Sequence, residues 1–289
     1  MKIKEIFSKK KPVLSFEIFP PKKDSALRDI DETLDILSEL EPDFISVTFG
    51  AGGSSNNNKT IEIAKKIKYK YGIEPLVHLT CLNYTKDEID SFIAVLNESG
   101  IQNILALRGD KNPDFPEKSD FHYASELTGY LKNTVNFCVA GACYPECHPE
   151  SKNKVQDISR LKEKVNAGSD FLITQLFFEN DLFYSFIESC RIAGIDVPVT
   201  SGIMPVINKA QIERIVSLCG ASLPDRFRRI LNKYENNTAA LFDAGMAYAL
   251  SQVIDLLAND VEGIHLYTMN NPVVAKRICE GIKNIIRSV

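Results

Sequence analysis

The sequence predicts an α/β fold, a closed (β/α)8 TIM barrel with extra helices before the last strand. Short apolar runs typical of buried strands alternate with amphipathic helical segments along all 289 residues, and eight such runs occur. Glycine and proline fall at the boundaries between these units rather than in one linker. Strands that alternate with helices indicate a parallel sheet, and eight units fit a closed barrel better than an open doubly wound sheet.

The eight predicted strands are short runs rich in β-branched and aromatic residues. In chain order they lie in SFEIF, FISVTF, LVHLT, NILAL, FCVAGAC, FLITQLFF, VPVTSGI and GIHLYTM. Pro20 and Pro21 follow the first run and end it, because proline cannot donate a ladder hydrogen bond.

The first predicted helix covers residues 25–40, where apolar residues such as Leu34 and Leu37 recur at spacings of three and four. Residues 225–234 and 239–257 are both helical in pattern, so the seventh connection carries an insertion. The segment GAGGSSNNN matches neither G-x-G-x-x-G nor a P-loop and is predicted to be a mobile loop. The other predicted helices are 86–97, 121–131, 155–166, 182–193, 209–219 and 273–286.

The composition restricts the class of function. A net charge of −4 and a pI near 5.7 argue against nucleic-acid binding, because nucleic-acid binders usually carry a basic excess. The basic N-terminus has no apolar region after it, and no run approaches the roughly 18 apolar residues of a membrane helix. Seven cysteines spread along the chain do not resemble a disulfide framework. We therefore expect a cytoplasmic, non-membrane protein with reduced thiols and small-molecule substrates.

Polar residues recur at the carboxyl ends of the predicted strands, where barrels of this type carry their active sites. Most come from different strands, so only closure of the barrel would bring them together. They are Glu17, Thr48, His78, Arg108, Asp110, Tyr144, His148, Gln175 and Tyr267. Taken alone, a residue such as His78 is more often a buried structural histidine than a catalyst. The aromatic cluster within residues 177–186 is likewise more often core than a stacking platform.

Glu17 stands inside the first apolar run, where an unpaired carboxylate would cost several kcal/mol. Alternation places Ser15 and Glu17 on the same face of the strand, opposite Phe16. If that face looks into the barrel mouth, partial desolvation raises the pKa of Glu17 and suits it to general acid catalysis. A structural pair with an arginine or lysine of the barrel explains the position equally well.

The tripeptide RGD follows the fourth strand. Gly109 permits close backbone approach, Arg108 is suited to an anion or a planar ring, and Asp110 accepts from ligand N–H groups. An ordinary Asx turn is the alternative interpretation. The segment CYPECH offers a partial metal site, but the C-x2-C pairing of common zinc sites is absent, so we expect no metal. The residues alone therefore indicate a barrel enzyme with an acid in a polar mouth.

Eight segments in a fixed order carry a family resemblance: SFEIFPPK, SVTFGAGGSS, HLTC, LALRGD, YPECHPE, AGSDFLITQLFF, SGIMPV and HLYTMNNP. Each is weak alone, but together they resemble the methylenetetrahydrofolate reductase family over residues 14–272. The resemblance implies a barrel that holds FAD noncovalently and takes a hydride from NADH or NADPH. It passes this hydride to 5,10-methylenetetrahydrofolate in a ping-pong cycle, which supplies methyl groups for methionine synthesis.

The same resemblance implies roles for the matching residues. Glu17 would be the general acid that opens the imidazolidine ring of the folate, and Asp110 would lie near the flavin and contact the pterin. Gln175 would hydrogen-bond the folate ring, and Gln211 would lie beside the substrate. The residues that would surround FAD are Thr48, His78, Arg108, Gly109, Asp110, Tyr144, His148, Asp157 and Lys164.

Three positions depart from the family pattern. Glu163 stands where an arginine often contacts the phosphate side of the flavin, and Ile215 where a phenylalanine flanks the substrates. Asn271 stands where an arginine follows the residues LN in the family pattern. The departure at Glu163 bears on the affinity for FAD, and that at Ile215 on packing over the bound nicotinamide or folate. The departure at Asn271 bears on binding of the glutamate tail of the folate.

The resemblance also bears on domains and partners. No internal linker is visible, so we expect one catalytic domain at residues 1–289. Because the chain ends soon after its last predicted helix, the C-terminal regulatory domain that binds S-adenosylmethionine in eukaryotic relatives is not expected. NADH is the preferred donor by analogy with short bacterial forms, and an iron–sulfur electron-transfer subunit is an alternative. A homodimer or homotetramer is expected, as in relatives.

Two other classes of protein are compatible with the sequence. A non-redox pterin-binding barrel, such as a one-carbon methyltransferase domain, would need the folate-facing acids but no flavin. A catalytically inactive ligand-binding or scaffold barrel would have no reason to keep Glu17, Asp110 and Gln175 together. Bound flavin would separate the reductase from both.

Overall fold

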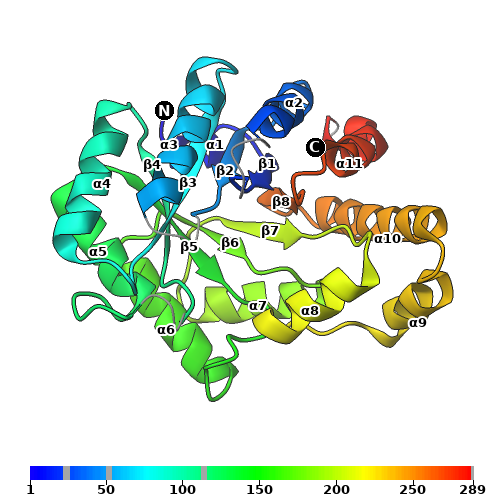
Figure 1. Cartoon of the computed structure of the whole chain (residues 1–289). Coiled ribbons are helices and arrows are strands. Elements are labelled where there is room, and N and C mark those ends of the chain that lie inside the picture. The colour runs from blue at the N-terminus through cyan, green and yellow to red at the C-terminus, as the bar shows by residue number, and fades with distance from the viewer. Residues whose placement is uncertain (22–26, 50–53, 112–115, 288–289) are drawn as a thin grey trace.

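The computed structural model describes residues 1–21, 27–49, 54–111 and 116–287. In this part of the chain eight parallel strands pair in chain order, and the last pairs with the first to close a barrel (Figure 1). The predicted TIM barrel is therefore confirmed. The strands are β1 (Val13–Ile18), β2 (Phe44–Val47), β3 (Glu74–Thr80), β4 (Asn103–Leu107), β5 (Cys138–Cys143), β6 (Phe171–Thr174), β7 (Val199–Ile203) and β8 (Gly263–Tyr267).

Helices cover the outside of the barrel, and the connection between β7 and β8 carries additional helices, as predicted (Figure 1). The helices are α1 (Lys4–Phe7), α2 (Leu27–Ser38), α3 (Ser54–Tyr69), α4 (Lys86–Glu98), α5 (Ala124–Thr134), α6 (Lys154–Asn166), α7 (Asn180–Ile192), α8 (Lys209–Cys219), α9 (Asp225–Tyr234), α10 (Thr238–Ala258) and α11 (Pro272–Ile286).

The side chains of β1 alternate between two environments. Leu14, Phe16 and Ile18 are buried in the apolar layer that the barrel shares with α2 and α11. Ser15 and Glu17 point the other way, into the barrel, where they contact histidines of β8 and β3. The predicted alternation of this strand is confirmed, and it places the carboxylate inside the barrel.

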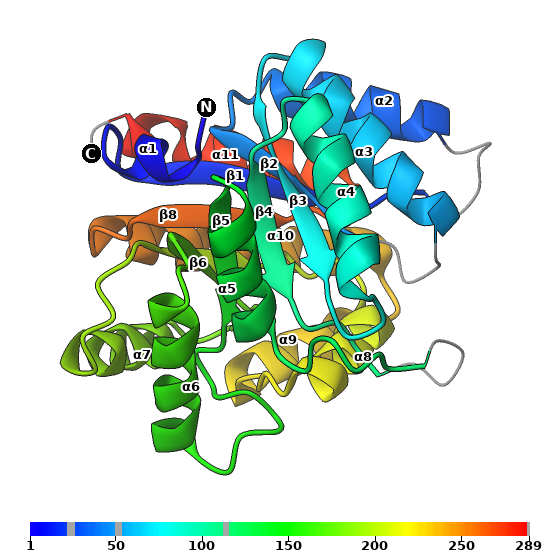
Figure 2. The ribbon, with the colours of Figure 1, turned by 90° about the vertical axis from the view of Figure 1, so that its left-hand side faces the viewer.

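The N-terminal segment lies across the amino ends of the strands (Figure 2). Ile3 and Ile6 are buried there, and the backbone N–H of Ile3 donates to the first residue of β4, Asn103, at 2.8 Å. Lys4 forms an ion pair with Asp170, just before β6, at 3.0 Å. This end of the barrel is therefore closed by packing, which leaves the carboxyl ends of the strands for chemistry.

Helix boundaries follow local capping signals. α8 begins and ends at the predicted residues, because Asn208 accepts from the N–H of Gln211 at its start and Gly220 adopts a left-handed conformation at its end. α9 also has its predicted bounds, although no side chain caps its start. Sequence reasoning missed the short α1 and all of α3. The predicted loop GAGGSSNNN lies partly outside the described residues, at 50–53. Its remainder, residues 54–58, is the helical start of α3, so the loop prediction is wrong there.

Helix α10 has the length and composition of a membrane span, with a mean hydropathy of 1.3, which the sequence reasoning did not recognise. It packs against α7, α9 and α11 on the outside of the barrel. Gly245 in its middle lies against the backbone of Val206. We interpret its apolar character as that of a helix packed on two sides.

Candidate active site

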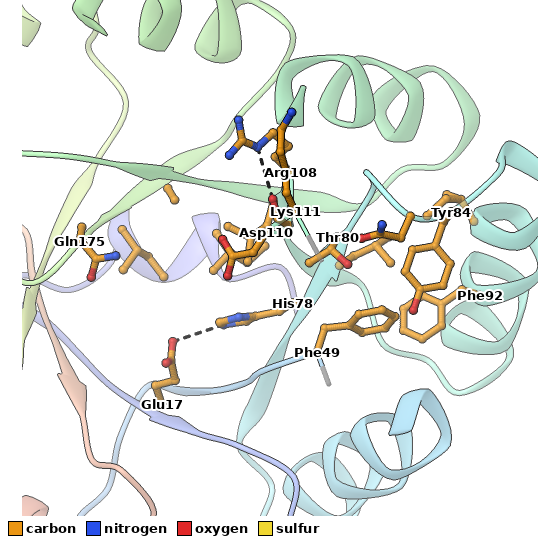
Figure 3. Close-up of a pocket in the computed structure, with 18 of the residues that line it drawn as sticks. Glu17, Phe49, His78, Thr80, Tyr84, Phe92, Arg108, Asp110, Lys111 and Gln175 are labelled. Carbon is orange, nitrogen blue, oxygen red and sulfur yellow. Dashed lines mark hydrogen bonds and ion pairs between the residues drawn. The ribbon is translucent and has the colours of Figure 1, made fainter. Parts of the chain in front are cut away.

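A cavity of about 1190 Å³ opens at the carboxyl ends of the strands (Figure 3). Pockets for small molecules usually measure about 300–1,000 Å³, so this one suits a large ligand or two ligands side by side. Barrel closure brings together many of the predicted site residues around it. Those that line the cavity are Glu17, His78, Arg108, Gly109, Asp110, Tyr144, His148, Gln175 and Tyr267.

Glu17 is held through one carboxylate oxygen, Oε2. This atom lies 3.4 Å from Nε2 of His78, 3.6 Å from Nε2 of His265 and 3.5 Å from the hydroxyl of Ser46. The Glu17 side chain is 21% exposed, through the cavity. The sequence left open a structural pair between Glu17 and an arginine or lysine. In the structure the neighbours of Glu17 Oε2 are instead two imidazoles and a hydroxyl.

The predicted rise in the pKa of Glu17 is wrong. Burial does raise the pKa of this carboxyl, but the neighbouring His265, His78 and Ser46 lower it, and the net result is a pKa below its ordinary value. Sequence reasoning counted desolvation alone, because both histidines lie on strands distant in the chain.

His78 forms part of the cavity wall and is 6% exposed. Burial lowers its pKa, so the ring is neutral at pH 7. Among the described residues its Nε2 atom has no hydrogen-bond partner, although it faces Glu17 (Figure 3). The imidazole of His78 and the carboxyl of Glu17 therefore both present polar atoms to a ligand in the cavity.

Asp110 and Gln175 lie across the cavity from Glu17 (Figure 3). Gly109 precedes Asp110 with a φ of +88°, and a Cβ atom there would lie 3.1 Å from Thr80. The RGD turn therefore needs glycine, as its sequence indicated. The Oε1 atom of Gln175 accepts from the N–H of Leu176 at 2.9 Å, which orients the amide group.

Arg108 is engaged by Glu150 in a bidentate ion pair, with N–O distances of 2.6 and 2.8 Å. This pair raises the pKa of Arg108 and lowers that of Glu150 to about 2. Next to it, the rings of Tyr144 and His148 meet edge to face at 4.6 Å. The predicted anion-binding arginine thus has a carboxylate partner that sequence reasoning did not anticipate.

Four predicted ligand-binding residues are outside the wall of this cavity: Thr48, Asp157, Lys164 and Gln211. Gln211 lines a small adjoining pocket at the start of α8. Asp157 accepts from the hydroxyl of Ser151 at 2.8 Å. The Lys164 ammonium donates to the carbonyl of Ala142 at 2.7 Å, and burial lowers its pKa.

One of the three residues that depart from the family pattern, Asn271, has a local explanation. Asn271 caps α11, because its side chain accepts from the N–H of Val273 at 3.1 Å. Ile215 lines both the cavity and the adjoining pocket, so its side chain does face the ligand space. Glu163 is exposed on α6, and nothing in the structure explains its identity.

Sequence reasoning missed several residues of the site. His265 stands two residues before Tyr267, so alternation along β8 would have placed both inside the barrel. An aromatic wall formed by Phe49, Tyr84 and Phe92 gave no local signal, because its members come from three segments.

The cavity is large enough for a dinucleotide such as FAD. Three cationic residues, Arg108, Lys111 and Lys118, line it and match a diphosphate. Its wall carries three carboxylates, Glu17, Glu88 and Asp110, as well as these cations. Two of the cations, Arg108 and Lys111, are paired with glutamates that such a ligand would have to displace. Among the described residues, no group of three or more His, Cys, Asp or Glu side chains is placed to hold a metal ion. The seven cysteines are free thiols, and Cys143 is buried at the end of β5.

Comparison with known proteins identifies the family. The family model for methylenetetrahydrofolate reductase matches residues 2–283. The 5,10-methylenetetrahydrofolate reductase of Salmonella typhimurium is 35% identical over 268 residues, which are 92% of this chain and 89% of that protein. "Methylenetetrahydrofolate reductase (NADH) 1" of Arabidopsis thaliana is 33% identical over 93% of this chain, which spans 48% of its length.

A solved structure adds support for the fold alone. An uncharacterized protein from Clostridium thermocellum that binds two copies of 5-methyl-5,6,7,8-tetrahydrofolic acid superimposes with a TM-score of 0.65 at 15% identity, over the whole of both chains. The sequence matches to the two reductases, in contrast, cover more than 90% of this chain at 33–35% identity, which shows that the proteins belong to one family. The resemblance predicted from the eight ordered segments is therefore confirmed, and this chain belongs to the methylenetetrahydrofolate reductase family, a family of oxidoreductases.

Proposed function

We propose that this chain reduces 5,10-methylenetetrahydrofolate to 5-methyltetrahydrofolate by a ping-pong cycle, with NADH as donor and noncovalently bound FAD as carrier. Family membership supports the reaction. The observation that carries the proposal is the position of Glu17, held by Oε2 in a polar cavity opposite Asp110 and Gln175. A carboxyl held in this way offers its other oxygen to a ligand.

Several residues of the cavity would hold FAD. Arg108 and its neighbour Lys111 suit the diphosphate, and Gly109 allows a ring to approach the backbone. When bound, FAD supplies the site that receives a hydride from the donor and passes it to the folate. The protein contributes orientation, exclusion of water and control of one proton.

Glu17 delivers that proton. The reaction needs one proton at the folate nitrogen that leaves the methylene bridge, and a carboxylic acid facing the cavity is suited to donate it. A flat pterin over the cavity would remove the remaining water from a side chain that is now 21% exposed. Loss of this water raises the pKa of Glu17 and favours its protonated form at the moment when the acid is needed.

Asp110 and Gln175 serve the opened folate. Ring opening leaves a positive charge on the iminium form of the substrate, and the Asp110 carboxylate stabilises positive charge in the cavity. The Gln175 amide, oriented by its bond to the Leu176 N–H, suits the hydrogen-bonding edge of a pterin. Gln211 would meet the more distant part of the substrate from the adjoining pocket.

Other parts of the proposal rest on the relatives. The name of the Arabidopsis protein supports NADH over NADPH. We further propose that the barrel is the catalytic unit, that it works in the cytoplasm as a homo-oligomer, and that its product supplies methyl groups for methionine synthesis.

Anaerobic visible spectroscopy of the purified protein tests this function. The spectrum is recorded as purified or after reconstitution with FAD, then after NADH, and finally after methylenetetrahydrofolate. The proposal predicts a flavin spectrum that NADH bleaches and the folate restores, with 5-methyltetrahydrofolate as product. A flavin that NADH does not bleach would contradict the donor, and absence of flavin after reconstitution would favour a non-redox pterin barrel.

A further inference from the structure

The end of β8 is bound to two other strands by successive side chains. Tyr267 lines the cavity, and its hydroxyl donates to the carbonyl of Thr174, at the end of β6, at 2.6 Å. The next residue, Thr268, is 1% exposed, and its hydroxyl donates to the carbonyl of Glu17 at 2.7 Å. Glu17 is also the register partner of Tyr267 in the ladder between β1 and β8. One short segment therefore links the strand that carries the carboxyl group to β6.

The bond from Tyr267 crosses β7, because the ladder between β6 and β7 ends one residue earlier, at Ile173. Regular parallel pairing would join the carbonyl of Thr174 to the N–H of Gly202. In the structure this N–H donates instead to the side-chain hydroxyl of Thr174, at 2.8 Å. The carbonyl of Thr174 is thereby left for the Tyr267 hydroxyl.

Gly202 makes this crossing possible. A Cβ atom at this position would lie 2.3 Å from the carbonyl oxygen of Thr174 and 2.7 Å from the ring of Tyr267. Both distances are shorter than any side chain tolerates, so the close approach requires glycine. The bond between β8 and β6 thus depends on the residue type in the strand that lies between them.

The carbonyl of Thr174 belongs to the peptide group that joins this residue to Gln175. The N–H of the same peptide group donates to the carbonyl of Cys143, at the end of β5, at 2.7 Å. This peptide is therefore held on one side by β5 and on the other by Tyr267 of β8. Rotation of the peptide would break both bonds, so they fix the direction in which the Gln175 side chain leaves the backbone.

The Tyr267 hydroxyl is suited to act as a permanent donor. Burial raises the pKa of this phenol, and the nearby Glu17 carboxylate raises it further, so the hydroxyl keeps its hydrogen at neutral pH. The edge of the ring also meets the face of His265 at a centroid distance of 5.2 Å and 89° between planes. The ring is thus packed independently of the bond that its hydroxyl makes.

We propose that Tyr267 is a positioning residue that fixes the distance between the carboxyl group of Glu17 and the amide of Gln175, so that both groups meet one folate ring. This inference rests on the proposed function, in which the two side chains contact different parts of the same substrate. A pterin is rigid, so two protein groups bind it together only at the matching separation. Tyr267 sets that separation because it is paired with Glu17 along the sheet and holds the peptide of Gln175 through its hydroxyl.

The first test removes only the hydroxyl, in Tyr267→Phe. Anaerobic stopped flow measures how the rate of flavin oxidation depends on the concentration of methylenetetrahydrofolate, which gives the Kd of the folate. We expect this Kd to rise about fivefold, the factor that one ordinary hydrogen bond supplies, because the Gln175 amide no longer meets the ring.

Tyr248→Phe is the matched control for this test. The Tyr248 hydroxyl also donates to a backbone carbonyl just beyond β6, that of Phe178, at 2.9 Å, but Tyr248 is absent from the cavity wall. The control loses the same kind of bond and should bind the folate as the wild type does. Equal Kd values in Tyr267→Phe and Tyr248→Phe would overturn the inference.

The second test determines whether Tyr267 acts through Gln175. The variants are Tyr267→Phe, Gln175→Ala and the combination of the two. If Tyr267 only positions the amide, the double variant binds the folate no more weakly than Gln175→Ala alone. Losses that multiply in the double variant would show that the hydroxyl acts independently of Gln175, and the positioning role would be wrong.

A third readout does not use turnover. Anaerobic equilibrium dialysis measures binding of the product, 5-methyltetrahydrofolate, to protein whose flavin has been reduced, so that the bound product has no oxidised flavin to reduce. We expect a loss of affinity of about fivefold in Tyr267→Phe and wild-type affinity in Tyr248→Phe. Wild-type affinity in Tyr267→Phe would refute the positioning role.

These experiments separate the two proposals. A wild-type flavin that the folate does not oxidise would refute the proposed function and, with it, the role of Tyr267 in that function. A wild type that oxidises its flavin with the folate, with Tyr267→Phe and Tyr248→Phe equal in folate affinity, would refute the positioning role alone.

Discussion

Replacement of Glu150 by glutamine tests how Arg108 serves the cavity. In the structure this arginine is bound by both carboxylate oxygens of Glu150, at 2.6 and 2.8 Å. If Arg108 is to bind the phosphate side of FAD, it must weaken or leave this pair. We therefore expect Glu150→Gln to bind FAD more tightly than the wild type.

The size of the effect follows from the exposure of the pair. Hydrogen bonding by Arg108 lowers the pKa of Glu150 to about 2, which indicates a strong preference for the paired carboxylate. The Glu150 side chain is 58% exposed, however, so water screens most of this preference. Exposed ion pairs contribute about 0.2–1 kcal/mol, and bidentate geometry places this one near the upper end. About 1 kcal/mol corresponds to a roughly fivefold lower Kd for FAD.

The assay is titration of cofactor-stripped protein with FAD, followed by quenching of flavin fluorescence. Asp35→Asn is the matched control, because it makes the same change of net charge and breaks a similarly exposed pair. In that pair Lys70, just after α3, lies 2.9 Å from Asp35 on α2, whose side chain is 55% exposed. Equal affinities in wild type and Glu150→Gln, or weaker binding by the variant, would refute this reasoning. Weaker binding would mean that Glu150 orients Arg108 for the cofactor rather than competing with it.

Two further predictions concern stability and are measured by urea unfolding. In α10, a Cβ on Gly245 would lie 1.7 Å from the carbonyl oxygen of Val206, so Gly245→Ala should destabilise by about 1–3 kcal/mol despite the better helix propensity of alanine. Gly129→Ala in α5 meets no described atom within 4 Å and should stabilise by about 0.5–1 kcal/mol; equal effects at both sites would contradict this. Asp170, 12% exposed, accepts from Lys132 at 2.7 Å, and Asp170→Asn should cost about 1.5–3 kcal/mol at neutral pH. Burial raises the pKa of Asp170, but hydrogen bonds and charge from its partners lower it more, so the net pKa lies below its ordinary value of 3.8. The contribution of Asp170 to folding stability is therefore present above the unfolded-state pKa and is lost as pH falls through the folded-state pKa. The wild type and Asp170→Asn should therefore converge in acid; a constant difference would refute the assignment.

The architecture was predictable because its signals are local. Alternating strand and helix patterns specify a parallel barrel, and caps such as Asn208 and Gly220 set helix ends to the residue. The start of α3 escaped detection because SSNNN is a sequence of poor helix formers that usually marks turns. Short α1 is likewise defined by its burial against the barrel rather than by its own periodicity.

The environment of the site was not predictable, because its partners are distant in the chain. His265 lies 250 positions from Ser15, and Glu150 lies 42 positions from Arg108. Local sequence therefore identified the chemical groups but not the contacts that set their pKa values. The error over Glu17 has this origin: its desolvation was visible in the strand pattern, whereas the imidazoles that offset it were not.

The central claim, that Glu17 donates the proton that opens the folate ring, is tested most directly by Glu17→Gln in the two half-reactions. Glutamine keeps the shape of the side chain but has no proton to donate at neutral pH. The variant should retain flavin and be reduced by NADH at about the wild-type rate. Its oxidation by methylenetetrahydrofolate should fall by roughly 10²–10⁴, the usual contribution of a general acid. Oxidation at the wild-type rate in a variant with intact flavin would contradict the account.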